Sequence, residues 1–513
     1  MAIKRNWLYF LLGTLLISAF FHFRSPNIPD PDSLYHLRHA WLYRTGSMVD
    51  TGFPWTYYSV IRLLGADLWY GFHLFLTPFT YFGDLLFGNK AVGIFMTAGL
   101  LLIFGWILKR HQISLPFFWP FIFFFSVPNA LFQLLMVRPH LLSLALSIAL
   151  LSVLISGSWP AVFLLSALIV FFHLSFFWIA PGIAFLIFLL RIFHNHNWKL
   201  GLANFLWVIV GTALGALLRP EPLAALQLVY IQVVKLLVEK QSSLPLLFSR
   251  ELAPLSFGTL FQTSFLFLIL WVPAIFISVW ALYRSRLIFS KIVPEVKIFL
   301  LGSGFLSLVF FLMSVFIARR SYIFWVAFGM IFSAGVYGYL LPKKSQNFGL
   351  MIIAIIFLLM VPYAIYKNDI GMRTAALPPD YLKAPALWLG DNSNPGDIVF
   401  NTHWDNFSAL FFWNQTNYYI GGMDPIFQYV YKPELYWKFH HISKDEFGDL
   451  TCGEAVCGRS NTEDVYKVLK EDFKAKYILA EKRRNPNLLA FLNQDSRFEE
   501  SFNNGKEMIF LLK

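Results

Sequence analysis

Hydrophobic residues recur in long runs through the first two-thirds of the chain, and a more polar stretch follows. A helix needs about 20 apolar residues to cross roughly 30 Å of hydrocarbon, and most of these runs approach that length. The predicted fold is therefore mainly α, a polytopic transmembrane helix bundle over residues 1–366. About eleven spans are predicted, at 7–23, 69–87, 91–108, 115–133, 140–156, 159–190, 201–218, 260–283, 298–317, 321–341 and 349–366.

The pattern changes from about Lys367 onwards. Turn-forming pairs such as Pro378-Pro379 and Gly421-Gly422 punctuate this part of the chain. A short apolar run at 397–400 precedes a predicted helix over 463–473 and a strand over 476–480. Residues 367–513 are therefore expected to form a small soluble C-terminal α/β domain.

Charged loops orient the predicted bundle. The first span follows Lys4 and Arg5 and ends without a small-residue cleavage site, so it is expected to be a retained helix that starts in the cytoplasm. Counting spans from there places the loops Asn195–Lys199 and Arg284–Lys297 in the cytoplasm, in agreement with the positive-inside rule. We expect a multi-pass protein of the bacterial inner membrane, with its N-terminus cytoplasmic and its C-terminal domain extracytoplasmic.

Two features disagree with this count or leave it open. The loop Lys109-Arg110-His111 falls outside the cytoplasm, against the positive-inside rule. The run 159–190 could also be two short helices, since Pro160 and Pro181 permit breaks. The same count puts Arg138-Pro139-His140 near the cytoplasmic face, away from the chemistry predicted below.

The outer face gathers the unusual segments of the chain. These are the external loops 24–68 and 219–258, the pair Arg319-Arg320 and the tail 367–513. Apolar residues three or four apart within 31–45 and Gln227–Lys240 predict helices that lie in the membrane interface. Such helices can wall a groove where a lipid-borne headgroup meets water.

Composition narrows the class of protein and its partners. With 57% hydrophobic and 14% charged residues, the chain is not a soluble globular protein. The net charge of +12 comes mostly from short connections between apolar runs, where anionic lipids explain it without nucleic acid. The two cysteines, Cys452 and Cys457, could form a disulfide outside the cytoplasm or remain free thiols.

Charge clusters directly after the first span. Asp30 and Asp32 are followed by His36 and Arg38 on the first turns of a predicted helix. Neighbouring carboxylates suit a general base or a ligand to a divalent metal, Mn²⁺ or Mg²⁺, and a guanidinium holds a phosphate. Asp32 could alternatively be a helix N-cap, which is compatible with a catalytic role.

The segment Asp32-Ser33-Leu34-Tyr35-His36-Leu37-Arg38 resembles the Asp-x-x-(aromatic)-(Asn/His)-x-Arg signature in the first external loop of oligosaccharyltransferase catalytic subunits. Those enzymes belong to the GT-C superfamily of membrane glycosyltransferases. The resemblance implies an inverting transfer from a polyprenyl-phosphate or polyprenyl-diphosphate sugar, with Asp30, Asp32 and His36 as catalytic residues. It also implies metal ligands from Asp30, Asp32 and Glu251.

Further residues complete the predicted site. Arg319 and Arg320, with Arg38, are expected to bind the donor phosphate as it leaves, although arginines at a span's end can also reach lipid phosphates. The alternative for Glu251 is an exposed loop charge paired with Arg250. His173, inside an apolar run, is expected to bond to a neighbouring helix and is kept out of the catalytic set.

The tail supplies candidates for acceptor recognition. Trp404 and Asp405 lie in His403-Trp404-Asp405-Asn406-Phe407, which shares only Trp-Asp with the Trp-Trp-Asp-Tyr-Gly block of oligosaccharyltransferases. An aromatic face and a carboxylate suit sugars or peptides, and a packed domain core is the alternative.

The sequence thus predicts a membrane glycosyltransferase that moves a sugar or oligosaccharide from a polyprenyl-linked donor to an acceptor at the extracytoplasmic face. The acceptor could be a glycan, a lipid or a protein. A multi-span transporter or lipid flippase is the alternative, although transporters usually carry their charges at the membrane midplane. A noncatalytic scaffold would lose no rate when Asp32 is removed.

Overall fold

The computed structural model describes residues 2–241, 249–284, 292–341, 343–446 and 448–513. The chain divides into two compact units, each made of three segments. We call them the helical unit, Met1–Asp30, Tyr81–Arg219 and Arg250–Leu377, and the mixed unit, Pro31–Thr80, Pro220–Ser249 and Pro378–Lys513. The domain boundaries 1–366 and 367–513 stay a prediction.

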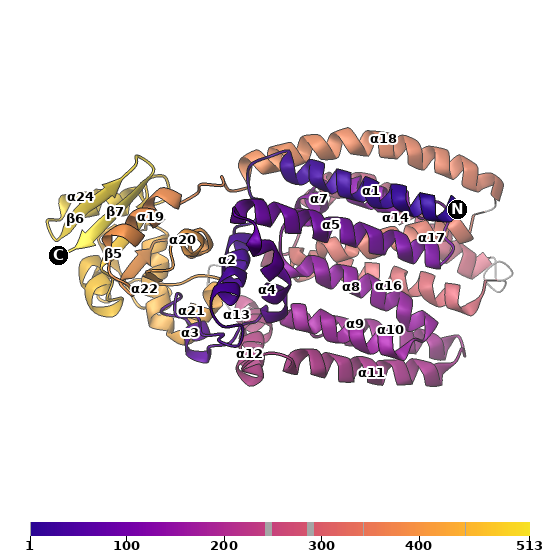
Figure 1. Ribbon diagram of the computed structural model, residues 1–513, viewed down its shortest axis with the longest axis horizontal. Coiled ribbons are helices and arrows are strands. Elements are labelled where there is room, and N and C mark those ends of the chain that lie inside the picture. Colours follow the sequence, from indigo (N-terminus) through magenta and orange to yellow (C-terminus); the bar gives the residue numbers. More distant parts are fainter. Residues whose placement is uncertain (1, 242–248, 285–291, 342, 447) are drawn as a thin grey trace. The chain divides into compact units, whose positions relative to one another are not determined.

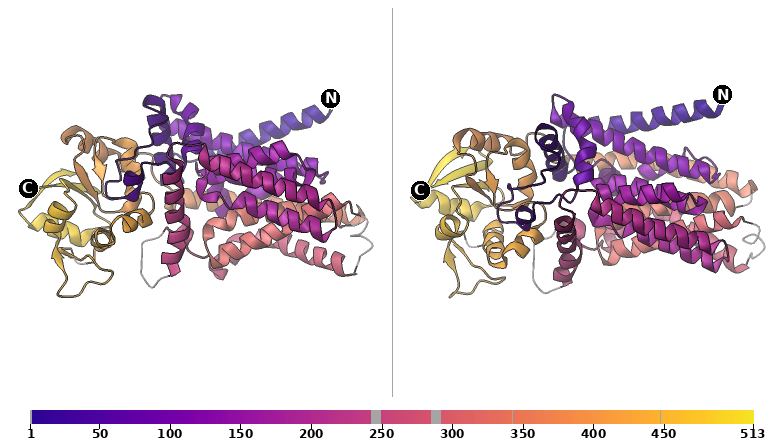
Figure 2. Two further views of the ribbon diagram at one scale, coloured as in Figure 1. Left: turned by 90° about the horizontal axis from the view of Figure 1, so that it is seen from below. Right: turned by 60° about the horizontal axis from the view of Figure 1, so that its bottom comes forward.

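The helical unit is a bundle of long apolar helices (Figures 1 and 2). Among the described residues, ten helices are long and apolar enough to cross a membrane, and all but Pro222–Glu239 belong to this unit. Its helices are α1 (Ala2–Phe23), α5 (Leu85–Arg110), α6 (Trp119–Ser126), α7 (Pro128–Leu134), α8 (Pro139–Ser156), α9 (Trp159–Phe172), α10 (Ile179–Phe193), α11 (Trp198–Leu217), α14 (Phe257–Arg284), α16 (Pro294–Phe316), α17 (Tyr322–Tyr339) and α18 (Lys343–Thr374).

Three predicted spans differ from the structure. The run 69–87 is not one helix, because it holds α4 (Tyr70–Leu76), a 3₁₀ turn, Thr77–Tyr81, and the first residues of α5 from Leu85. The run 115–133 breaks into α6 and α7 at Val127, which is extended, as expected before Pro128. The run 159–190 is two helices: α9 ends at Phe172 and α10 begins at Ile179, and a 3₁₀ turn, Leu174–Phe176, separates them.

Two glycines on α11 allow it to pack closely on α9. A Cβ atom at Gly215 would lie 2.2 Å from the backbone oxygen of Ala167, and one at Gly211 would lie 2.4 Å from that of Phe163. The spacing Gly-x-x-x-Gly puts both glycines on one face of the helix, where small residues let two backbones approach. This contact fixes the place of α9, which is only 14 residues long.

The mixed unit is built on a five-stranded sheet. Its strand order is β2-β1-β5-β7-β6, with β2, β1 and β5 parallel and β7 antiparallel to both β5 and β6. The apolar run noted at 397–400 is strand β1, and the strand predicted at 476–480 is confirmed as β5. The strands are β1 (Ile398–Asn401), β2 (Tyr418–Tyr419), β5 (Tyr477–Glu481), β6 (Phe498–Asn503) and β7 (Glu507–Leu512), with a separate pair β3 (Leu450–Thr451) and β4 (Glu463–Asp464).

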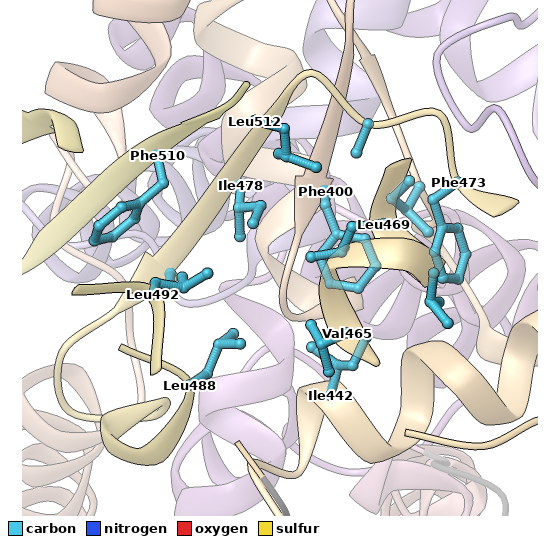
Figure 3. Close-up of a cluster of buried hydrophobic side chains, with 14 of the residues drawn as sticks. Phe400, Ile442, Val465, Leu469, Phe473, Ile478, Leu488, Leu492, Phe510 and Leu512 are labelled. Carbon is cyan, nitrogen blue, oxygen red and sulfur yellow. The ribbon is translucent and has the colours of Figure 1, made fainter. Parts of the chain in front are cut away.

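The helices of the mixed unit come from the tail and from the two loops. They are α2 (Pro31–Thr45), α3 (Val60–Leu64), α4, α12 (Pro222–Val229), a π-helical stretch (Tyr230–Lys235), α13 (Leu236–Gln241), α19 (Lys383–Asn392), α20 (Phe407–Trp413), α21 (Pro425–Tyr431), α22 (Pro433–Ser443), α23 (Val465–Lys467), a second π-helical stretch (Val468–Asp472) and α24 (Pro486–Gln494). Figure 3 shows the apolar core in which Phe400 and Ile478 from the sheet meet Leu469 and Leu492.

The first loop is joined to this sheet by backbone hydrogen bonds. The nitrogen of Tyr419 donates to the oxygen of Trp55 at 2.8 Å, and the nitrogen of Tyr57 donates to the oxygen of Tyr419 at 2.8 Å. The indole nitrogen of Trp55 also donates to the backbone oxygen of Gln415. Residues 55–57 therefore extend the sheet beyond β2, and the loop is part of the folded tail rather than a separate segment.

The two helices predicted within the external loops are present. Residues 31–45 form α2, and the predicted helix Gln227–Lys240 falls within the run from α12 to α13. Their position at the membrane interface stays a prediction. Part of the predicted loop 219–258 and part of Arg284–Lys297 lie outside the described residues.

Gly215→Ala should destabilise the protein. Alanine normally stabilises a helix interior by about 1 kcal/mol relative to glycine, but here its methyl group would collide with the backbone of α9. We expect a net loss of about 1–3 kcal/mol, measured as a lower thermal midpoint in detergent. The control is Gly182→Ala on α10, where an added Cβ meets nothing within 4 Å. Equal midpoints for the two variants would contradict the close packing.

Candidate active site

Asp30 lies buried at the end of the first segment of the helical unit. Two backbone hydrogen bonds between Ile28 and Leu377, of 2.8 and 2.9 Å, hold the chain just before it. The carboxylate is 1% exposed, so its charge requires a partner.

Arg138 supplies that partner with a two-pronged ion pair. Its Nε donates to Asp30 Oδ2 at 2.6 Å, and its Nη2 donates to Asp30 Oδ1. Arg138 precedes Pro139, the first residue of α8, and its backbone is extended, with φ −132° and ψ 154°. The proline thus keeps Arg138 extended, and its guanidinium projects from the segment between α7 and α8.

The same guanidinium reaches a second carboxylate. Nη1 of Arg138 donates to Glu251 Oε2 at 2.8 Å, and Nη2 of Arg320 lies 3.4 Å from the same oxygen. Glu251 belongs to a 3₁₀ turn, Arg250–Leu252, and a hydrogen bond from Arg319 N to Ala253 O ties this segment to the turn Arg319–Ser321. Asp30, Arg138, Glu251 and Arg320 therefore form one chain of ion pairs, which we call the arginine network.

Glu251 is held ionised by this arrangement. Burial by itself raises the pKa of its carboxyl, but Arg138 and Arg320 outweigh burial and lower that pKa to about 2. The network pairs two guanidinium groups with two carboxylates, so its formal charges balance. A guanidinium is also the side chain best suited to bind a phosphate through two parallel hydrogen bonds.

The position of Arg138 corrects the predicted topology. Arg138 is not away from the predicted chemistry, because it contacts Asp30 directly. The error came from counting 69–87 as a span, which put every loop after it on the wrong side of the count. Counting 159–190 as one span rather than two then cancelled the error, so the loops after residue 190 were unaffected. The corrected count also brings Lys109-Arg110-His111 to the same end of the bundle as Asn195–Lys199. Contacts with the last turns of α8 agree with this: His111 bonds to Ser152, and Arg191 donates to the backbone oxygens of Leu154 and Ile155.

Two histidines left out of the predicted site lie near the arginine network. His140, in the first turn of α8, and His173, between α9 and α10, both interact electrostatically with Arg138 and Arg320. His173 Nδ1 lies 3.3 Å from Ser143 Oγ on α8, so its predicted bond to a neighbouring helix is confirmed. Nε2 of His140 is buried and has no hydrogen-bond partner within the described part of the chain.

A divalent metal does not fit the arginine network as it stands. Both oxygens of Asp30 accept from Arg138, whose guanidinium takes the place between Asp30 and Glu251 that a cation would need. The assignment of Asp30, Asp32 and Glu251 as metal ligands stays a prediction, and no step below passes through a metal.

Other side chains could in principle share a metal ion. In the described residues, two groups of three potential ligands lie close together: His39, Asp67 and His73, and His441, Cys452 and Cys457. The second group cannot offer thiolates, because Cys452 and Cys457 form a disulfide. Hydrogen bonds already engage Asp67 and both ring nitrogens of His73.

Asp32, His36 and Arg38 lie on α2 in the mixed unit. Asp32 is in the first turn, and His36 is four residues later on the same helix face. The guanidinium of Arg38 packs over the rings of Trp41 and Phe412, at 4.8 and 5.1 Å. Burial lowers the pKa of Arg38 to about 10, so it remains charged at neutral pH.

Trp404 and Asp405 lie at the carboxyl end of β1, where a polar edge forms. Asp405 accepts from both terminal nitrogens of Arg484, at 3.0 and 3.2 Å, and Asn406 donates to Glu481 at the end of β5. Carboxyl ends of parallel strands are common ligand-binding positions. Arg484 and Glu481 were not selected as site residues from the sequence. Their position directly after a predicted strand could have indicated them, because the ends of parallel strands often carry binding residues. The acceptor-binding role of Trp404 and Asp405 stays a prediction.

No protein-family model and no curated protein matches this chain in sequence. Solved structures do match it in fold. An oligosaccharyltransferase from Archaeoglobus fulgidus, tethered with an acceptor peptide containing the NVT sequon, aligns over 98% of this chain and 74% of its own, with a TM-score of 0.57 at 11% identity. ArnT from Cupriavidus metallidurans, bound to undecaprenyl phosphate, aligns over 98% of both chains, with a TM-score of 0.54 at 11% identity.

A third match is the mycobacterial arabinofuranosyltransferase AftD, with a TM-score of 0.58 at 13% identity over 99% of this chain. This chain covers 41% of that longer protein. The chain has a GT-C fold. The GT-C architecture predicted from the segment Asp32–Arg38 is therefore confirmed, together with a multi-pass membrane bundle and a small C-terminal sheet domain.

The arginine network predicts how stability depends on pH. The folded pKa of Glu251, about 2, lies below its ordinary value of 4.5, so its contribution is fully present above pH 4.5 and is lost as pH falls towards 2. Glu251→Gln should remove on the order of 3 kcal/mol at neutral pH and progressively less in acid.

Thermal midpoints of the wild type and of Glu251→Gln, measured in detergent from about pH 7 to about pH 3, test this. The gap between the two proteins should narrow as the pH falls. Glu221→Gln, at an exposed position, is the control and should leave no pH-dependent gap. A constant gap for Glu251→Gln would contradict the ion pairing.

Proposed function

We propose that this protein is an inverting glycosyltransferase, which transfers a sugar from a polyprenyl-phosphate-linked donor to an acceptor at the extracytoplasmic face of the bacterial inner membrane. The observation that carries the proposal is the arginine network, in which Arg138 and Arg320 border the half-buried Glu251 at one end of the bundle. The fold shared with ArnT bound to undecaprenyl phosphate supports a lipid phosphate as the group that this cluster recognises.

The proposed chemistry is a displacement at the anomeric carbon. The acceptor hydroxyl attacks this carbon as the bond to the phosphate oxygen breaks, and the leaving phosphate takes the bonding electrons. Arg319 and Arg320, with Arg38, stabilise the charge that develops on it. Asp32 polarises the hydroxyl, and its proton passes to a base on α2, either Asp32 or His36. Asp30 keeps Arg138 in place.

The orientation is inferred from charge and redox chemistry. Lys109, Arg110 and Lys199 belong to the end of the bundle opposite the arginine network, as the positive-inside rule requires if that end is cytoplasmic. The disulfide Cys452–Cys457 in the mixed unit suits an oxidising compartment. Trp404, Asp405 and Arg484 would then meet the acceptor outside the cytoplasm.

Purified protein reconstituted with radiolabelled polyprenyl-phosphate and polyprenyl-diphosphate sugars tests the proposal. Arg320→Ala and Asp32→Asn should each lower turnover by roughly a hundredfold or more, because each removes charge that acts at the reacting atoms. The matched control is Arg373→Ala, an exposed arginine in the last turn of α18, which should keep full turnover.

The same vesicles separate transfer from transport. A transporter or flippase would move the labelled lipid across the membrane without forming a glycosylated product. Full turnover in Arg320→Ala would remove the arginine network from the mechanism, even if transfer itself is observed.

A further inference from the structure

A line of side-chain hydrogen bonds joins α2 to α4 within the mixed unit. His36 Nδ1 on α2 lies 2.8 Å from His73 Nε2 on α4, and His73 Nδ1 lies 2.6 Å from Asp67 Oδ2 in the loop before α4. The three residues are 3%, 0% and 4% exposed, respectively. Polar groups so deeply buried are costly unless they are bonded to one another.

Asp67 is the fixed end of this line. Besides the bond to His73, it accepts from the hydroxyl of Tyr43 at 2.8 Å and from the backbone nitrogen of Trp69 at 2.9 Å. Burial alone would raise the pKa of its carboxyl, but His73, His39 and these donors outweigh burial and hold that pKa below its usual range. Asp67 is therefore an ionised acceptor.

An ionised Asp67 sets the direction of the bond that it makes to His73. Because the carboxylate can only accept, Nδ1 of His73 carries a proton. When that is the only proton on the ring, Nε2 of His73 accepts from Nδ1 of His36, and Nε2 of His36 carries a lone pair. In that state one carboxylate fixes the tautomers of both histidines.

This arrangement also makes His36 a better base. When Nε2 of His36 takes up a proton, its Nδ1 proton can shift towards His73, where the positive charge faces the Asp67 anion. An aspartate supports a catalytic histidine in serine hydrolases by the same physical means. His36 is four residues after Asp32 on the same face of α2, so a proton accepted there comes from the group that Asp32 polarises.

A shared metal explains the geometry less well. The rings of His39 and His73 lie against each other, with centroids 4.2 Å apart and planes tilted by 31°. A metal ion lies in the plane of each imidazole that binds it, and both ring nitrogens of His73 are already engaged by His36 and Asp67.

We propose that Asp67 and His73 are positioning residues for proton transfer, which keep Nε2 of His36 ready to accept the proton that the acceptor hydroxyl loses as the glycosidic bond forms. The proposal rests on the proposed glycosyl transfer. His36 is the catalytic base, and Asp67 and His73 act only through it.

The titratable groups around this line are few. His39, Tyr35 and Tyr43 face it from α2, Tyr70 faces Tyr43 from α4, and Asp32 lies on the same helix as His36. Asp67 differs from these groups because its carboxylate is hydrogen-bonded directly to His73, so its removal should change the behaviour of His36 strongly.

Asp67→Asn tests the proposal through the pH profile. The variant should lower kcat by roughly a hundredfold with little change in the KM for the lipid donor, and should move the acidic limb of kcat/KM to lower pH, because the imidazolium loses its counter-ion. The matched control is Tyr43→Phe, which removes another hydrogen bond to Asp67 but leaves the line intact, and should change kcat by less than about threefold.

Three results would overturn the proposal. The first is an Asp67→Asn variant that loses rate only in proportion to its thermal midpoint, with an unchanged pH profile. The second is loss of activity with a chelator and recovery with Zn²⁺, which would assign these residues to a metal. The third is a ¹⁵N spectrum of histidine-labelled wild-type protein in which the neutral ring of His36 carries its proton on Nε2 instead of Nδ1. That spectrum needs no turnover, so it decides the tautomer even if the glycosyl transfer itself is not observed.

Discussion

The arginine network depends on one interaction, the ion pairing of the Arg138 guanidinium with both Asp30 and Glu251. Asp30 and Glu251 come from segments far apart in the sequence, and both are largely withdrawn from water. Two carboxylates in that position repel each other and lose hydration, and a single arginine that forks between them removes both costs. The place of Arg320 follows, because Glu251 can accept from both arginines at once. Both guanidinium groups are thus held in place by carboxylates.

In the mixed unit, aromatic packing and hydrogen bonding hold the candidate site residues in place. The side chain of Arg38 is enclosed by Trp41 and Phe412, and the ring of Tyr35 is within 6.5 Å of Phe407. These contacts join α2, from the first external loop, to α20, from the tail. The catalytic residues proposed on α2 are therefore held by a folded domain, although they belong to a segment that reads as a loop between two spans. A site built on packed elements is more precise than one built on a loop.

Much of this arrangement could be read from the sequence, because it depends on local pattern. The apolar runs predicted most of the long helices, and the acidic start of α2 with its Asp-x-x-Tyr-His-x-Arg spacing predicted the GT-C fold. Strands β1 and β5 stood out as short apolar runs between turns. Each of these features depends on residues that are neighbours along the chain.

The errors share one physical cause. Hydropathy measures whether a side chain avoids water, and it does not distinguish burial in lipid from burial in protein. Residues 69–87 are apolar because Phe72 and Leu76 are in the interior of the mixed unit, yet they read as a span. That false span contained His73 and reversed the side assigned to Arg138. Both residues acquire their partners only through contacts distant in sequence, which no local pattern records.

The pairing of residues 55–57 with Tyr419 has a consequence for how the chain is made. Trp55 and Gln415, which bond across this junction, are 360 positions apart. A ribosome adding roughly 5–20 residues per second would take about 20–70 s to supply the second partner after the first. During that interval the first loop has no sheet to join, and its aromatic residues lack the domain that later buries them. The first loop therefore completes its fold only when translation of the chain is nearly finished.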